Sequence, residues 1–327
     1  MLTRRQTLTA LLAAATAATT PAVAATDETL RLGAIFGGSP LRPDSPLGKI
    51  LIGALADLGY TVDRNLNFEA RGAMAQAGKL PGLIAELKAQ GAQIFIAAGY
   101  PSAAAAKAAG VSTVVLGGVG DPVATGLVES WAHPGGLVTG LSDDAATLTV
   151  KRLEFLKALL PSLKRVAMLW NADDLAMTLR YQACAATAQK QGIVVQPLEV
   201  RQPDDFNGAF AAMDRDKPDA ILMVADALTD LNRKLVIDFA AARRLPAIYE
   251  YGFYTRDGGL MSYGPDPRES VTRAASMVDR IFKGARPGDI PFEQPTRYLF
   301  LFNLKTARAI GLEPPVTLLA LADEVIE

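Results

Sequence analysis

The polar residues best suited to bind a small solute come directly after apolar, strand-like runs of the sequence. In open parallel sheets, ligands lie beyond the carboxyl ends of the strands, where loops lead into helix N-termini. We therefore expect a ligand site built from loops of both halves of the chain. The candidate ligand-binding residues are Ser39, Tyr100, Ser102, Asp121, Asn171, Asp226, Glu250 and Tyr251.

The candidates of the first half suit the acidic end and the side chain of a ligand. Ser102 opens a predicted helix, whose free N–H groups and positive dipole end attract a carboxylate, although a plain N-cap would also place a serine there. Ser39 has the same two interpretations. Tyr100 could form the wall of a pocket for an aromatic or aliphatic ligand, or lie on the surface. Asp121, before Pro122, could contact a ligand or simply hold a turn.

The candidates of the second half suit a positively charged group. Asp226 and Glu250 are acids at strand ends, and an ammonium group desolvated in a closed cleft needs a carboxylate partner. We expect one of the two to face the ligand, with Tyr251 beside it. The alternatives are helix capping by Asp226 and a salt bridge by Glu250. Asn171 could donate to the ligand or cap the next helix.

The sequence contains few of the residues and motifs that a catalytic, metal or cofactor site would need. The single Cys184 and the single His133 cannot form an internal disulfide or a zinc site of the usual type. Gly118-Val119-Gly120 lacks the third glycine and the acidic partner of a dinucleotide loop, and neither a P-loop nor a G-x-S-x-G motif occurs. A serine triad would need His133, which has no nucleophile motif to match. Only a carboxylate pair for glycoside chemistry stays open, so we expect no enzyme, no metal and no cofactor.

The composition is that of a globular protein without an attraction for nucleic acid. The 327 residues include 33 basic and 34 acidic side chains, which gives a formal net charge of −1. Such a balance provides no field to attract nucleic acid or an anionic membrane surface. The length and the 50% of hydrophobic residues indicate about two domains.

Residues 1–24 have the pattern of an export signal. Arg4 and Arg5 precede an uncharged run over 8–20, and Ala22-Val23-Ala24 is a small-x-small cleavage site. The paired arginines favour the twin-arginine route, with the general secretory route as the alternative. The run is too short to span a bilayer, and no cysteine stands at the cleavage point for a lipid anchor. We expect a free, monomeric periplasmic protein with no membrane insertion.

From residue 30 onward, short apolar strands alternate with amphipathic helices. Strands are predicted over 30–36, 65–70, 92–98, 112–116, 165–170, 193–200, 220–224, 247–251, 258–264 and 297–302. Helices are predicted over 46–59, 79–90, 102–109, 143–160, 175–191, 205–216, 227–244 and 267–283, and a Pro-rich linker over 284–295. A glycine repeatedly ends a helix and turns the chain back into a strand. This alternation, broken near 134–144, predicts an α/β fold with two doubly wound parallel-sheet lobes.

Several segments in order resemble the bacterial ABC-transporter substrate-binding proteins whose best-known members bind tryptophan or related amino acids. They are DPVATGLV at 121–128, HPGGLVTGL at 133–141, KRLEFLK at 151–157, GGLMSYG at 258–264, NLKTARAIGL at 303–312 and ADEVIE at 322–327. Leu137 departs from the asparagine that is common in the family at that position.

The resemblance implies a type I periplasmic binding fold with three crossovers, expected near 142–144, 251–259 and 288–295. The first lobe would then comprise 29–143 plus 260–288, and the second 144–259 plus 289–327. It also implies an ABC importer's substrate-binding component, which captures a small solute, an amino acid or an aromatic or carboxylate analogue, and docks on a permease with its ATPase. A sensory protein that presents its ligand to a membrane receptor is the alternative. A repressor would carry a DNA-reading headpiece in place of the export signal.

Overall fold

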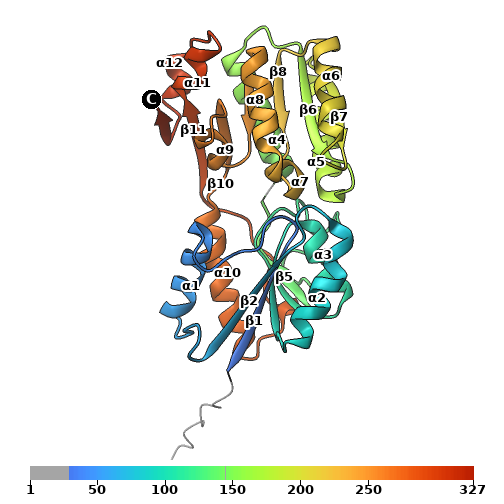
Figure 1. Cartoon of the computed structure of the whole chain (residues 1–327), viewed down its shortest axis with the longest axis vertical. Coiled ribbons are helices and arrows are strands. Elements are labelled where there is room, and N and C mark those ends of the chain that lie inside the picture. Colours follow the sequence, from blue (N-terminus) through green and yellow to red (C-terminus); the bar gives the residue numbers. More distant parts are fainter. Residues whose placement is uncertain (1–28, 144) are drawn as a thin grey trace, which may run out of the picture.

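Two parallel sheets, each covered by helices on both faces, organise the chain into two stacked lobes (Figure 1). The computed structural model describes residues 29–143 and 145–327. The predicted export signal over 1–24 lies outside these residues. The α/β fold with two parallel-sheet lobes is confirmed.

The first sheet has five parallel strands in the order β2-β1-β3-β4-β5. They are β1 (Leu30–Phe36), β2 (Leu66–Gly72), β3 (Ile94–Ala98), β4 (Ser112–Val115) and β5 (Val138–Gly140). The helices are α1 (Pro46–Asp57), α2 (Leu80–Ala89), α3 (Tyr100–Ala108) and, from late in the chain, α10 (Pro267–Phe282). Leu32 packs with the core of α1 and α10, whereas Ile35 and Phe95 pack with that of α2 and α3. Side chains that point alternately to the two faces thus build two cores on one sheet.

The second sheet has seven strands in the order β12-β11-β10-β9-β8-β6-β7. They are β6 (Arg165–Asn171), β7 (Val194–Val200), β8 (Ala220–Met223), β9 (Ala247–Tyr249), β10 (Met261–Pro265), β11 (Tyr298–Asn303) and β12 (Glu324–Ile326). Only the pair β10–β11 is antiparallel. The helices are α4 (Ala145–Leu159), α5 (Leu175–Lys190), α6 (Asp205–Asp216), α7 (Ala227–Leu231), α8 (Arg233–Arg243), α9 (Gly252–Arg256), α11 (Leu304–Ala309) and α12 (Val316–Leu319).

The strand pairing alters the expected lobe boundaries. The segment 260–288 was predicted to belong to the first lobe, but β10 pairs with β9 and β11 in the second sheet. From α10 onward the segment packs against the first lobe, with Val271 and Val278 in the core that α10 shares with α1 and with the Gly288 carbonyl oxygen accepting from the N–H of Gly135 at 3.2 Å. The chain therefore changes lobes between β10 and α10, not in the predicted stretch 251–259, which forms α9. The other two crossings follow β5 and precede β11, close to the expected positions.

Most predicted elements form within a few residues of their expected ends, with one clear difference. The helix predicted over 227–244 is divided into α7 and α8 at Asn232. The Asn232 Nδ2 group donates to the carbonyl oxygen of Leu228 at 2.8 Å, and such side-chain bonds to the backbone compete with regular helix. Among the residues described, no helix has the length and apolar character needed to cross a membrane.

Candidate functional site

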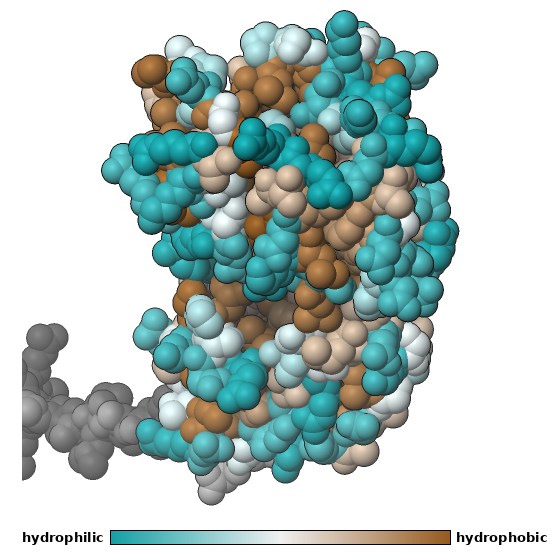
Figure 2. Space-filling view, turned by 45° about the horizontal axis from the view of Figure 1, so that its top comes forward, coloured by the Kyte–Doolittle hydropathy of each residue, from teal (hydrophilic) through white to brown (hydrophobic). Residues whose placement is uncertain are grey.

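The carboxyl ends of the two sheets meet where the lobes face each other. A Cβ added to Gly37, after β1, would lie 3.1 Å from the Cβ of Ala227, after β8, and one added to Gly120, after β4, would lie 3.8 Å from the Cβ of Ala176 on α5. Tyr100 packs against the cores of both lobes. Figure 2 shows a hollow between the lobes in which apolar residues gather. The structure is therefore a closed form with a candidate ligand site between the lobes.

Ser102 brings an unused hydroxyl group to this place. It lies in the first turn of α3, which begins after Gly99, a residue with a φ of 82° that few L-residues adopt. Ser102 is completely buried, and its Oγ has no hydrogen-bond partner among the described residues. The Cβ position of Gly37 is 3.7 Å from that oxygen. Because a buried polar group without a partner is costly, this hydroxyl is suited to a ligand.

Asp226 lies across the interface, one residue before Ala227. Its Oδ1 accepts from the backbone N–H of Thr229 at 2.8 Å, and the Thr229 hydroxyl accepts in turn from the Asp226 N–H, a capping box at the start of α7. Its Oδ2 accepts from Asn171 Nδ2 at 2.5 Å. Burial raises the pKa of Asp226, and the hydrogen bonds from Thr229 and Asn171 partly oppose this rise. The predicted residues Asn171 and Asp226 thus come together, and the capping role weighed for Asp226 is observed.

Two further acids that the sequence analysis missed lie near Asp226. Asp174 is 2% exposed and caps α5 by accepting from the N–H groups of Ala176 and Met177. Burial, and then the charge of Asp226, raise the pKa of Asp174 to about 8. Asp230 accepts a hydrogen bond from the Tyr254 hydroxyl, and burial, followed by the charges of Asp226 and Glu250, raises its pKa well above the ordinary value. Asp174 could have been found from its position directly before a predicted helix.

Glu250 does not offer a free carboxylate to a ligand. It is 1% exposed and pairs with two guanidinium groups, Arg180 Nη1 at 3.0 Å and Arg152 Nη2 at 3.4 Å. Arg180 also pairs with Asp143 at the end of the first lobe. The salt-bridge alternative for Glu250 is therefore the one observed. Its neighbour Tyr251 is partly buried against the core of α6 and α8, and burial raises the pKa of Tyr251 further above its ordinary value.

Ser39 and Asp121 occupy exposed positions in the loops after β1 and β4. The Asp121 Oδ1 accepts from the N–H groups of Val123 at 2.9 Å and Ala124 at 3.3 Å. Asp121 therefore holds the local turn, which was its alternative interpretation. For Ser39 the structure adds no contact that favours a ligand.

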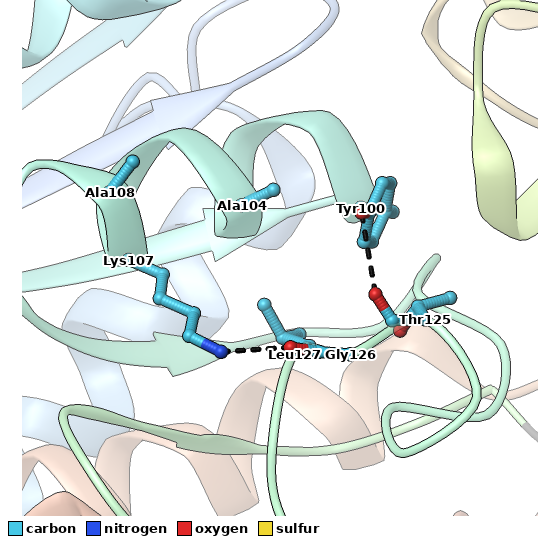
Figure 3. Close-up of a pocket in the computed structure, with 7 residues that line it drawn as sticks. All are labelled: Tyr100, Ala104, Lys107, Ala108, Thr125, Gly126 and Leu127. Atoms are coloured by element: carbon cyan, nitrogen blue, oxygen red, sulfur yellow. Dashed lines mark hydrogen bonds between the residues drawn. The ribbon is translucent and has the colours of Figure 1, made fainter.

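Tyr100 also lines a shallow pocket beside α3, of about 340 Å³ (Figure 3). Its hydroxyl donates to the carbonyl oxygen of Thr125 at 3.4 Å, and Lys107 Nζ donates to that of Gly126 at 2.8 Å. These bonds fasten the 121–127 loop to α3. Within 29–143 and 145–327, no group of three or more His, Cys, Asp and Glu side chains is arranged to hold a metal ion.

Arg152 and Arg180 are the main residues that the sequence analysis missed. On α5 the buried positions are Ala176, Met177, Arg180, Cys184 and Ala188, so that the arginine stands in the apolar stripe. Arginine is almost never fully buried unless it is paired. A single charged residue in the apolar stripe of a predicted helix was the sequence pattern that could have identified Arg180 as a buried, paired residue.

The two lobes, with strand ends facing across a cleft, define a solute-binding protein of the type I periplasmic binding fold. Residues 48–326 match the family model described as ABC transporter substrate binding protein, and the chain belongs to this family. It is 25% identical to the "Tyrosine-binding protein" of Clostridioides difficile, over 81% of this chain and 76% of that protein.

Two solved structures show the same fold. A conserved domain protein from Vibrio cholerae superposes with a TM-score of 0.84 at 22% identity, and a domain from Streptococcus pneumonia in complex with L-Trp with a TM-score of 0.81 at 23% identity. Each comparison covers 91% of this chain and 100% of the other.

Proposed function

We propose that the chain captures a zwitterionic amino acid with an aromatic side chain between its lobes, in the periplasm, and delivers it to an ABC permease with its ATPase. The observation that carries this proposal is the buried, unpartnered Ser102 hydroxyl at the N-terminus of α3, across the interface from the Asp226 carboxylate. A helix N-terminus favours a carboxylate, and a desolvated ammonium group needs an acid. The two charged ends of an amino acid match these two positions.

The aromatic part of the proposal draws on Tyr100 and on the relatives. Tyr100 lies between the cores of both lobes, where its ring can contact a ligand and both halves of the protein. One relative is named a tyrosine-binding protein, and one solved structure of the same fold holds L-Trp. Contacts with both lobes would favour the closed form over the open one, so that ligand capture needs no covalent chemistry.

Calorimetric titration of protein that has been unfolded and refolded to remove a copurified ligand tests the proposal. L-Tyr, L-Trp and L-Phe are compared with tyramine, which lacks the carboxylate, with 3-(4-hydroxyphenyl)propionate, which lacks the ammonium group, and with L-Ala. We expect an aromatic amino acid to bind and both truncated analogues to lose at least about tenfold in affinity, equivalent to about 1.4 kcal/mol. If no amino acid binds, the proposed function is wrong. If the analogue without nitrogen binds equally well, Asp226 has no role toward an ammonium group.

A further inference from the structure

A buried chain of four charged side chains passes from the first lobe into the second. Arg180, on α5, binds Glu250 through Nη1 and Asp143 through Nη2, and Arg152 Nη2 forms an ion pair with Glu250 Oε1 at 3.4 Å. All four residues are at most 2% exposed. Asp143 follows β5 at the end of the first lobe, whereas Arg180 and Glu250 belong to the second. The ion pair between Asp143 and Arg180 therefore joins the lobes beside their first crossing.

The first-lobe end of this chain is tied to the candidate site by hydrogen bonds. Asp143 Oδ1 accepts from the N–H of Gly120 at 3.0 Å, and Ser142 Oγ donates to the Gly120 carbonyl at 2.6 Å. In the same loop, the carbonyl groups of Gly117 and Gly118 accept from the N–H groups of Gly99 at 3.0 Å and Tyr100 at 2.9 Å. The loop over 117–121 therefore connects Asp143 with the start of α3, where Ser102 lies.

The second-lobe end reaches the opposite wall. Glu250 follows β9 and precedes Tyr251, which packs in the core beneath the strand ends of that lobe. Arg152 Nε donates to the carbonyl oxygen of Tyr263 on β10, the strand that leads to the second crossing, at 2.7 Å. Gly264, the next residue, passes so close to Glu250 that a Cβ there would lie 2.3 Å from the Glu250 carbonyl oxygen. The charged chain is thus held by rigid backbone on both sides.

We infer that Arg180 is a positioning residue for ligand capture: by binding Asp143 and Glu250 at once it holds the two lobes in the closed arrangement and, through the 117–121 loop, sets the start of α3 against the second lobe. This inference rests on the proposed function, since it assigns Arg180 to the capture step. A guanidinium group suits the role because its planar fork of donors can bind two carboxylates at fixed angles, which a lysine ammonium does not reproduce.

Disulfide trapping across the interface measures closure without any ligand. In a protein carrying G37C and A227C, the two Cβ atoms would stand 3.1 Å apart with the lobes as they are here. A separation of ~3.5–4.5 Å is usual in a disulfide, so that a shift of a few tenths of an ångström between the lobes brings the pair into bonding range. Oxidised glutathione drives the reaction, and its rate reports how often the lobes close. The native Cys184 is buried, and burial raises its pKa to about 11, so that it remains a thiol.

The variants D143N and R180Q are compared with D279N. Asp279 is a buried acid that accepts from the Tyr60 hydroxyl at 2.8 Å, wholly within the first lobe, and so serves as a matched control. We expect D143N and R180Q to slow trapping at least about fivefold in the ligand-free protein and to weaken amino-acid affinity roughly 5- to 150-fold, the usual range for coupled sites. D279N should leave both quantities within twofold of the wild type.

The inference is overturned if D143N and R180Q trap and bind like D279N. Should either variant fail to fold by circular dichroism, R180K replaces it. We expect R180K to slow trapping less than R180Q would, because lysine keeps the positive charge but lacks the planar fork that holds both carboxylates at fixed angles. A wild type that binds no amino acid would refute the proposed function alone, since the ligand-free trapping rates still decide the role of Arg180.

Discussion

Ala227, at the start of α7, lies against Gly37 so closely that a Cβ on the glycine would stand 3.1 Å from its own. One residue follows β1 in the first lobe and the other follows β8 in the second. The absence of a side chain at Gly37 therefore allows the strand ends to meet. A bulky residue at this position would act as a wedge between the lobes.

The variant G37L should keep its fold and lose ligand affinity. The backbone of Gly37 does not have a positive φ, so that leucine introduces no local strain there. Its side chain meets Ala227 only when the lobes close, and we expect a Kd weakened at least about tenfold, as for a binding-competent state that is rarely populated. Titration calorimetry and urea unfolding measure the two effects. G53L is the control, since apart from the backbone of α1 itself no atom lies within 4 Å of a Cβ at Gly53; equal affinities of the two variants would contradict closure at this contact.

The variant S102A should lose ligand affinity without losing stability. The Ser102 hydroxyl makes no hydrogen bond within the described chain, so its removal costs the ligand-free protein nothing. With an amino acid bound, the loss of one hydrogen bond to a charged group should cost about 1.5–3 kcal/mol of binding free energy. Thermal unfolding and calorimetry of the same preparation test both statements.

Thr113 provides the opposite case for comparison. Its buried hydroxyl donates to the carbonyl oxygen of Val111 at 2.8 Å, away from the interface between the lobes. T113V should therefore lower stability by about 1 kcal/mol and leave the Kd unchanged. If S102A instead unfolds more easily than T113V and binds as the wild type does, Ser102 is a structural residue.

Local patterns in the sequence were sufficient for the sheets but not for the partners of the charged groups. Apolar periodicity and capping glycines are patterns that extend over about ten residues, and they are enough to predict a strand or a helix. The strands and helices predicted in this way are largely confirmed. Arg180 lies 37 residues from Asp143 and 70 from Glu250, and no local pattern specifies which acid a buried arginine will meet. For the same reason β10 was assigned to the wrong lobe, because strand order depends on pairing across the whole chain.

The short elements at the ends of the second lobe were missed for a different physical reason. The helices α9, α11 and α12 have four to six residues and β12 has three. Such segments are stabilised by the elements they pack against and not by their own propensity. Among the candidate residues, the sequence correctly grouped Asn171 and Asp226 at the strand ends of the second lobe. It could not show which acid, Asp226 or Glu250, is free to face a ligand, because the pairing of Glu250 with two arginines depends on residues far away in the chain.

The variant D226N should discriminate between ligands according to their charge. Asparagine caps a helix about as well as aspartate, so that α7 should remain intact. It cannot neutralise an ammonium group, and we expect affinity for an aromatic amino acid to fall by at least about tenfold while the analogue without nitrogen binds unchanged. D121N serves as the control, because Asp121 is exposed and holds its own turn. A similar loss in D121N would transfer the role to that residue.

The buried Asp174 should make the free energy of unfolding fall as the pH rises. Its pKa is about 8 in the folded protein, against 3.8 as the ordinary value. Between these two values the folded state retains a proton that the unfolded chain has released, so that each increase in pH favours unfolding, by up to about 1.4 kcal/mol per unit for one full proton. Well below pH 4 and well above pH 8 this residue contributes no slope.

We therefore expect the ligand-free wild type to be more stable at pH 5 than at pH 8, and D174N to lose part of that dependence while keeping its helix cap. Urea unfolding at pH 5, 6, 7 and 8 measures the slope. Asp226 and Asp230, whose pKa values burial also raises, should maintain the remainder. D173N is the matched control, since Asp173 is exposed in the same loop and pairs with Arg201. Equal slopes in D174N and D173N would show that Asp174 is ionised throughout this range and that the remaining slope belongs to Asp226 and Asp230.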